Sequence, residues 1–216
     1  MATPRTETRS RVLRTAATLF RRQGYHATGL NQLLAESSAP KGSLYFHFPG
    51  GKEQLAAEAV LLSARDLGTQ MGEAMDAASA AASPSGAGAE AAAAAIAALG
   101  NLFAESLESS GYLEGCPIAT VALETASANA DIRSACARSY AAWQTGLAER
   151  MRGWGVPQDE ADPLAELVLA GLQGALLLAR VRQDAALVRQ IADRLGAQVA
   201  AAATAATATG SATRDN

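Results

Sequence analysis

The segment "SSAPKGSLYFHFPGGK", residues 37–52, differs in composition from the rest of this 216-residue chain. It holds both lysines of the protein, one of its two histidines and three of its ten aromatic residues. Pro40 is tolerated in the first turn of a helix, and Pro49 followed by two glycines ends one. The segment therefore predicts a short helix, "KGSLYFHF" (41–48), with an unusual concentration of cations and rings.

Two further helices are predicted before this one. Residues 8–23 place five residues on one stripe at helical spacing, and Gly24 ends that helix. The stripe consists of Val12, Ala16, Leu19, Phe20 and Gln23. Thr28 is a suitable N-cap for a helix over 29–37, whose apolar face is formed by Leu30, Leu33 and Leu34. This order predicts a helix-turn-helix, in which the second helix of the pair enters the DNA major groove.

Composition favours an all-α protein. Hydrophobic residues make up 49% of the chain, alanine is abundant and β-branched runs are scarce. Six more helices follow the first three, which gives about nine in total. They are expected over 52–75, 89–109, 116–128, 131–155, 157–184 and 185–202.

Several classes of protein are disfavoured. Cys116 and Cys136 are too few for a disulfide framework or a metal-ligand set, so we expect buried free thiols, no metal and no cofactor. The polar N-terminus does not resemble a secretory signal. The most apolar stretch, residues 164–181, is interrupted by Glu166 and Gln173 and predicts a buried or interface helix, not a membrane span. We expect a soluble cytoplasmic protein.

The net charge of −3 hides an asymmetry. Residues 1–60 hold eight Lys and Arg against four acids, whereas residues 61–216 hold ten arginines against seventeen acids. A cationic head on an acidic body suggests that the head meets a polyanion. The alternative is an ordinary solvated surface with scattered arginines. A protein that coats DNA without sequence preference would spread its cations over the whole chain.

The side chains of the predicted third helix suit DNA recognition. Gly42 lets the backbone approach the duplex, and Ser43 can donate or accept a hydrogen bond. Tyr45 ends in a hydroxyl suited to phosphate, while Lys41 and His47 can donate to phosphates or purine acceptors.

Other residues complete this surface. Lys52 opens the following helix, where its charge and the free backbone N–H groups can meet a phosphate together. Leu44 and Phe48 are four residues apart and are expected to point into the core of the head. The candidate DNA-binding residues are Thr28, Asn31, Lys41, Gly42, Ser43, Tyr45, Phe46, His47 and Lys52.

Residues 8–55, "TRSRVLRTAATLFRRQGYHATGLNQLLAESSAPKGSLYFHFPGGKEQL", strongly resemble the DNA-binding head of TetR-type transcriptional repressors. The resemblance lies in the "A..LF...GY..T" approach, the turn, the "KGSLYFHF" helix and the lysine that opens the fourth helix. Pro40 replaces the small hydroxyl residue that usually precedes the first lysine. The segment "GCPIATVALETA" (115–126) resembles the subgroup of the LmrA and YxaF repressors, whose members sense drug-like or aromatic molecules.

The resemblance implies a DNA-binding domain (1–55), a regulatory and dimerisation domain (56–205) and a disordered tail (206–216). It implies a double-stranded pseudo-palindromic operator, a homodimer formed by the last two helices and a small-molecule effector. Candidate effector-binding residues are Phe103, Tyr112, Cys116, Leu123, Trp143, Leu147 and Trp154. Candidate dimer residues are Leu164, Leu167, Val168, Gly171, Leu172, Ala175, Leu176 and Ala179, for which burial in the chain's own core is the alternative.

The body has no histidine and no lysine, which favours an uncharged, partly aromatic effector. It also offers no serine elbow, metal cluster or glycine-rich phosphate loop, which disfavours the alternative of a small helical enzyme. An activator built on the same scaffold remains a second alternative, because that role depends on where the operator lies.

Overall fold

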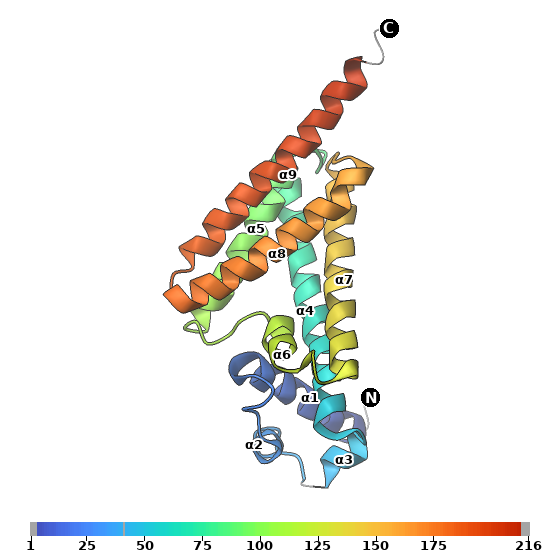
Figure 1. The fold of residues 1–216 in the computed structure, drawn as a ribbon, viewed down its shortest axis with the longest axis vertical. Coiled ribbons are helices and arrows are strands. Elements are labelled where there is room, and N and C mark those ends of the chain that lie inside the picture. Colours follow the sequence, from blue (N-terminus) through green and yellow to red (C-terminus); the bar gives the residue numbers. More distant parts are fainter. Residues whose placement is uncertain (1–3, 41, 213–216) are drawn as a thin grey trace. The chain divides into compact units, whose positions relative to one another are not determined.

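A computed structural model describes residues 4–40 and 42–212 (Figure 1). Within these ranges the chain forms nine α-helices, which confirms the all-α prediction. They are α1 (Pro4–Gln23), α2 (Leu30–Glu36), α3 (Ser43–His47), α4 (Gly51–Ala82), α5 (Gly88–Ser109), α6 (Pro117–Thr125), α7 (Ala130–Gly153), α8 (Gln158–Arg182) and α9 (Ala186–Ala212). Three helices run several residues further than predicted. α1 begins at Pro4 instead of residue 8. α4 continues to Ala82, and α9 continues through part of the expected tail to Ala212, while 213–216 lie outside the described residues.

The chain divides into two compact units, and the division falls inside α4 and α7. The first unit comprises Met1–Leu67 and Leu113–Tyr140, and the second comprises Gly68–Tyr112 and Ala141–Asn216. The first unit therefore includes α6 together with the three N-terminal helices. This division differs from the expected boundary at residue 55, which followed the extent of the family resemblance.

The core of the first unit follows the predicted apolar pattern. Val12, Ala16, Leu19 and Phe20 of α1 are buried, but Gln23 is exposed. They are joined by Leu33 and Leu34 of α2, by Leu44 of α3 and its C-cap Phe48, and by Leu55 and Ala56 of α4. Gly24 has a φ of +85° and its N–H bonds to the Phe20 carbonyl, so the glycine ends α1 as predicted.

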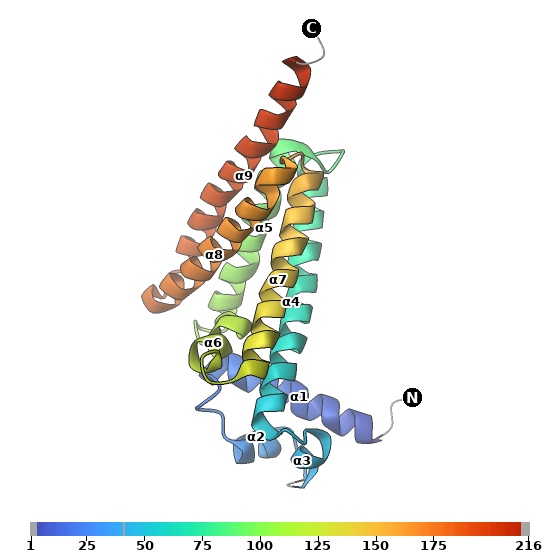
Figure 2. The ribbon, with the colours of Figure 1, turned by 45° about the vertical axis from the view of Figure 1, so that its right-hand side comes forward.

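The second unit is organised around α5, which packs along α9, while α8 packs against both (Figures 1 and 2). Small residues permit the close approach of α5 and α9. A Cβ atom added at Gly100 of α5 would lie 2.4 Å from the Cβ of Ala192 in α9. One added at Gly196 of α9 would lie 3.1 Å from the Ala93 carbonyl oxygen. The small side chains of alanine and glycine therefore allow the backbones of α5 and α9 to pack closely.

Among the described residues, one helix is long and apolar enough to cross a membrane. This helix is α8, whose most apolar window has a mean hydropathy of 1.7. A core helix of a soluble protein passes the same test, and α8 has a buried face of Ala161, Ala165, Val168, Leu172, Ala175, Leu176 and Ala179. Its apolar character is therefore explained in part by packing inside the second unit.

Candidate nucleic-acid interface and effector residues

The helix α3 presents two large rings to solvent. Tyr45 is 63% exposed and Phe46 is 56% exposed, whereas Leu44 and Phe48 on the opposite side are buried, as predicted. Gly42 is the N-cap of α3 and is exposed, and His47 is half-buried at its last residue. On α2, Asn31 is exposed. The first unit thus brings five of the candidate DNA-binding side chains or backbone positions to its surface near α3 and α2.

A chain of polar contacts, which the sequence patterns did not reveal, runs from the residue that precedes α4 along the first two turns of that helix. The Gly50 N–H donates to Gln54 Oε1 at 2.8 Å, and Gln54 Nε2 donates to Glu58 Oε1 at 3.0 Å. Glu58 also pairs with Arg9, whose guanidinium lies 4.8 Å from the centre of the Phe48 ring. The only sequence signal for this chain is the spacing of Gln54 and Glu58, four residues apart on one helix.

The position of Thr28 contradicts its prediction as a DNA-binding residue and as the N-cap of α2. It is completely buried, and its hydroxyl donates to the Gly24 carbonyl at 2.7 Å instead of capping α2. The N-cap of α2 is Gly29, so the start of α2 has no side-chain cap. The carbonyl at the end of α1 has no partner within the helix, so the nearby hydroxyl satisfies it. A buried threonine cannot reach DNA, and we remove it from the candidate residues.

The start of α3 also differs from the prediction. Pro40 lies before the helix, which begins at Ser43. The Ser43 N–H and hydroxyl both donate to the Pro40 carbonyl, at 2.9 and 2.6 Å. The hydroxyl proton of Ser43 is therefore engaged within the turn, although its oxygen can still accept a bond. Lys41, a candidate phosphate donor, lies outside the described residues.

Lys52 begins α4 as predicted and is partly covered. Its ammonium group lies 4.3 Å from the centre of the Tyr25 ring. Burial lowers the pKa of the Lys52 ammonium, and the charge of Glu124 opposes this shift. Glu124 belongs to α6, and one of its carboxylate oxygens accepts the His26 N–H at 2.7 Å. A residue of α6 therefore holds the turn between α1 and α2 and acts on a candidate phosphate-binding cation.

Several arginines of the cationic head have partners within the first unit. Arg9 pairs with Glu58, and Arg21 and Arg22 pair with Glu114 at 2.9 and 3.8 Å. The guanidinium of Arg11 donates to the carbonyls of Ser37 and Ser38 at the end of α2. The charge asymmetry of the sequence is real, but part of it serves the packing of the unit instead of a DNA surface.

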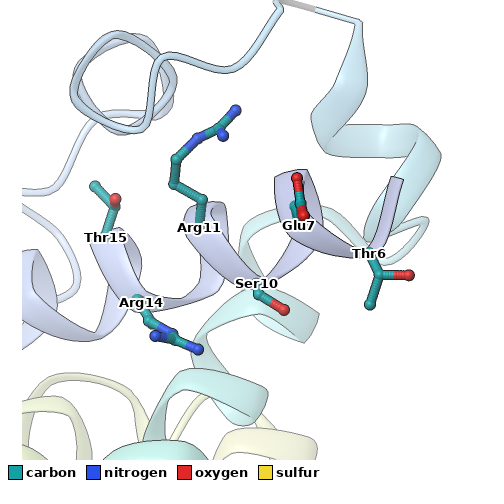
Figure 3. Close-up of a pocket in the computed structure, with 6 residues that line it drawn as sticks. All are labelled: Thr6, Glu7, Ser10, Arg11, Arg14 and Thr15. Atoms are coloured by element: carbon teal, nitrogen blue, oxygen red, sulfur yellow. The ribbon is translucent and has the colours of Figure 1, made fainter. Parts of the chain in front are cut away.

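An open cavity of about 420 Å³ lies along α1 (Figure 3). It is lined by Thr6, Glu7, Ser10, Arg11, Arg14 and Thr15, and Arg11 and Arg14 leave the helix in opposite directions. None of the predicted effector residues borders it. The cavity is open and its lining comes from a single helix, so it does not match the enclosed form of small-molecule sites.

The predicted effector residues fall in both units. Phe103, Trp143, Leu147 and Trp154 are buried in the second unit, where Tyr112 is half-buried. The Tyr112 carbonyl accepts a bond from Arg180 Nε at 3.1 Å, and its hydroxyl accepts one from the Ala185 N–H at 3.3 Å. In the same unit, Gln173 of α8 has a buried Nε2 with no hydrogen-bond partner among the described residues. The sequence patterns treated Gln173 only as an interruption of an apolar run.

The position of Leu123 contradicts its prediction as an effector-binding residue. Its side chain is 83% exposed, whereas the buried residues of α6 are Pro117, Ile118, Val121 and Thr125. Position 123 is two residues from both 121 and 125, and a helix turns by about 200° over two residues. The apolar character of Leu123 suggested a pocket wall, but its phase on the helix places it on the opposite face.

Cys116, the remaining effector candidate, belongs to a buried sulfur and phenol cluster in the first unit. Both cysteines are buried free thiols, as predicted. The sulfur of Cys116 lies 3.8 Å from the hydroxyl of Tyr140, which follows Cys136 by one turn of α7. Burial and the neighbouring Cys116 raise the pKa of the Cys136 thiol from 9.0 to about 11.

This raised pKa predicts how stability depends on pH. The unfolded chain releases the Cys136 proton near pH 9.0, but the folded chain holds it until about pH 11. The contribution to stability is therefore complete below pH 9 and is lost as the pH rises towards 11. We expect the free energy of unfolding, measured in urea with a reductant, to fall less steeply above pH 9 in Cys136→Ala than in the wild type. If the free energy of unfolding fell equally steeply with pH in both proteins, the raised pKa of Cys136 would be contradicted.

The dimer residues predicted on α8 are mostly internal. Val168, Leu172, Ala175, Leu176 and Ala179 are buried within the second unit, and Leu164 and Gly171 are half-buried. A Cβ atom on Gly171 would lie 2.9 Å from Leu195 of α9, so this glycine permits packing inside the chain. For the five buried residues the alternative of core burial is correct. Of the predicted set, Leu167 is the exposed member, at 43%.

A second apolar face of α8 is exposed. We call it the α8 outer face, and it comprises Leu167, Ala170, Gly174, Leu177, Leu178 and Val181. Leu177 is 59% exposed and Val181 is 75% exposed. Positions 167, 170, 174, 177 and 181 recur every three or four residues, so they form one continuous stripe along the helix.

These features define a helix-turn-helix protein with a helical body, and comparison with known proteins assigns its family. The model of bacterial regulatory proteins of the tetR family matches residues 12–59, and that of the C-terminal domain of LmrA/YxaF-like transcriptional regulators matches residues 92–194. The chain belongs to the TetR family of DNA-binding transcriptional regulators, a family of regulators and not of enzymes.

Three individual proteins show how far the similarity extends. The uncharacterized HTH-type transcriptional regulator YxaF of Bacillus subtilis is 33% identical over 89% of this chain and 95% of its own length. The HTH-type transcriptional regulator LmrA of the same organism is 34% identical over 80% of this chain and 86% of its own length. A TetR transcriptional regulator from Chloroflexus aurantiacus is 27% identical, with a TM-score of 0.71 over 89% of this chain and 93% of its own.

Proposed function

We propose that this protein is a cytoplasmic repressor that binds a pseudo-palindromic operator as a homodimer and is released by a small, uncharged, partly aromatic molecule. The observation that carries the DNA-binding part of the proposal is the exposure of Tyr45 and Phe46 on a helix whose other side is buried. The polar groups and rings on the exposed side of this helix are not used in the core of the first unit, so they are available to contact DNA.

The α8 outer face supports the homodimer. It is apolar, continuous and exposed, and the described part of this single chain leaves it uncovered. A two-fold axis brings the same face of a second copy against it, so that small residues such as Ala170 and Gly174 permit close helix approach. Two heads related by that axis read two half-sites, which accounts for a pseudo-palindromic operator.

The composition of the second unit supports the effector class. Phe103, Trp143 and Trp154 supply buried aromatic surface, and residues 61–216 contain no lysine and no histidine. The unpaired Nε2 of Gln173 is a donor that a carbonyl or ether oxygen of a ligand would satisfy. An effector can relieve repression only if it binds better to a state in which the heads no longer fit the operator.

The proposal is tested by fluorescence anisotropy with labelled DNA from the region that flanks the coding sequence, in the presence of excess random DNA. Tight binding that survives the competitor supports a specific regulator, and that complex then serves to screen aromatic ligands for release. If no fragment binds, selection from a random duplex pool follows. Failure to enrich any sequence would overturn the proposal. His47→Ala and Tyr45→Phe should each weaken binding without loss of helical content.

Lys52 provides a quantitative prediction. If its ammonium contacts one phosphate in each half-site, Lys52→Ala removes two contacts from the dimer and should reduce the slope of log K against log salt by about 1.8. Arg138→Ala removes the same charge from an exposed position on α7 and serves as the control. Its slope should equal that of the wild type. Equal slopes in the wild type and Lys52→Ala would exclude the phosphate contact, even if affinity for the operator fell.

A further inference from the structure

Phe46 differs from the other exposed residues of α3, because its side chain has no atom that can make a conventional hydrogen bond. It is 56% exposed, although its neighbours Leu44 and Phe48 are almost completely buried. Large apolar side chains are normally covered, and this ring points away from the core of the first unit. The head therefore exposes an aromatic ring on the helix that enters the major groove.

The orientation of this ring is restricted. Phe46 and His47 meet edge to face, with ring centres 5.0 Å apart and an angle of 78° between their planes. The helix itself is fixed by the buried side chains of Leu44 and Phe48, and the guanidinium of Arg9 lies 4.8 Å from the centre of the Phe48 ring. A ring held in this way can discriminate between groups in the groove by shape.

The chemistry of the major groove offers one apolar group on its base edges. Adenine, guanine and cytosine present hydrogen-bond donors and acceptors there, and thymine adds a C5-methyl group. Tyr45, His47 and Lys52 can serve the phosphates and polar base edges, but Phe46 cannot. We propose that Phe46 is a specificity-determining residue that contacts the C5-methyl group of a thymine in each operator half-site.

This inference rests on the proposed function, since it requires that α3 enters the major groove of an operator. It also predicts that 5-methylcytosine could replace the contact, because that base carries a methyl group at the same position of the groove. Removal of one buried methyl group should weaken binding roughly fourfold, and removal of one in each half-site roughly fifteenfold.

The experiment begins with selection of a tight-binding duplex from a random pool by the full-length protein. Each thymine of that duplex is then replaced singly by deoxyuridine, which lacks the methyl group and keeps every hydrogen-bonding atom. We expect one position in each half-site at which the wild type loses roughly fourfold in affinity. Phe46→Ala should bind thymine and deoxyuridine equally at that position, measured at low salt if its affinity is weak.

Tyr45→Phe is the matched control. It alters the neighbouring exposed ring and should retain the full penalty for deoxyuridine. A wild type that binds tightly with no sensitive thymine would overturn the role of Phe46 and leave the proposed function intact. A penalty that persists in Phe46→Ala would assign the methyl contact to another residue. If no duplex is enriched at all, the proposed function and this inference both fail.

Discussion

Replacement of Leu177 and Val181 by glutamate should convert the protein into a monomer and lower its affinity for a two-half-site operator roughly a hundredfold or more. Both side chains are more than half exposed on the α8 outer face, so the single chain should tolerate the change. In a dimer, however, the four carboxylates would be forced into an apolar interface, where unpaired charges are strongly disfavoured. Each head would then have to bind its half-site alone.

Sedimentation equilibrium measures the first effect and anisotropy with the selected operator measures the second. Leu123→Glu is the matched control, because Leu123 is 83% exposed on α6 and lies outside the α8 outer face. That variant should remain dimeric and bind as the wild type does. A double variant that remained dimeric would exclude this face as the interface. A monomer with unchanged affinity would contradict cooperation between two heads.

Substitution of Gly100 by alanine should destabilise the second unit by about 1–3 kcal/mol, although alanine is the better helix former. The new Cβ would lie 2.4 Å from that of Ala192 and 3.5 Å from the Val188 carbonyl oxygen, so α5 and α9 would have to separate. Gly146→Ala is the control. Its Cβ would meet Arg150 Nη1 at 3.7 Å, an ordinary contact, and helix propensity should then stabilise the protein by up to about 1 kcal/mol.

Urea unfolding of the Gly100→Ala, Ala192→Gly double variant tests whether the clash with Ala192 causes the loss of stability. Ala192→Gly alone should cost about 1–2 kcal/mol through the lost methyl group and the flexible backbone. If the clash is responsible, the double variant removes it and should be more stable than the sum of the single effects predicts. Additive losses would show that Gly100 is needed for a reason other than the approach of Ala192.

The DNA-binding head could be predicted well because its signals are local. The spacing of Val12, Ala16, Leu19 and Phe20 defines a helix face, and Gly24 ends that helix by adopting a positive φ. Thr28 shows the limit of such rules. A threonine before a helix is a good N-cap, but a carbonyl at the end of the preceding helix competes for the same hydroxyl, and sequence order does not indicate which partner is nearer.

The body was harder to predict because α8 is apolar on more than one face. Val168, Leu172 and Ala179 recur at helical spacing, and so do Leu167, Leu177 and Val181. Either set could face a partner chain, and periodicity alone cannot decide between them. The packing of α8 against α5 and α9 resolves the choice. Leu123 illustrates the same difficulty on α6, where an apolar residue lies on the solvent side.

The ion pairs of the head have a consequence for how the protein responds to ionic strength. Of the six arginines in residues 1–60, Arg9 pairs with Glu58, and Arg21 and Arg22 share Glu114, so two carboxylates offset two of these three positive charges. These carboxylates act as built-in counterions, so the head competes less with dissolved cations for the DNA backbone. Binding should release few ions and lose little affinity as salt rises, and the wild-type salt slope reports this directly. We therefore expect binding to depend less on ionic strength than it would for a head whose arginines lack such partners.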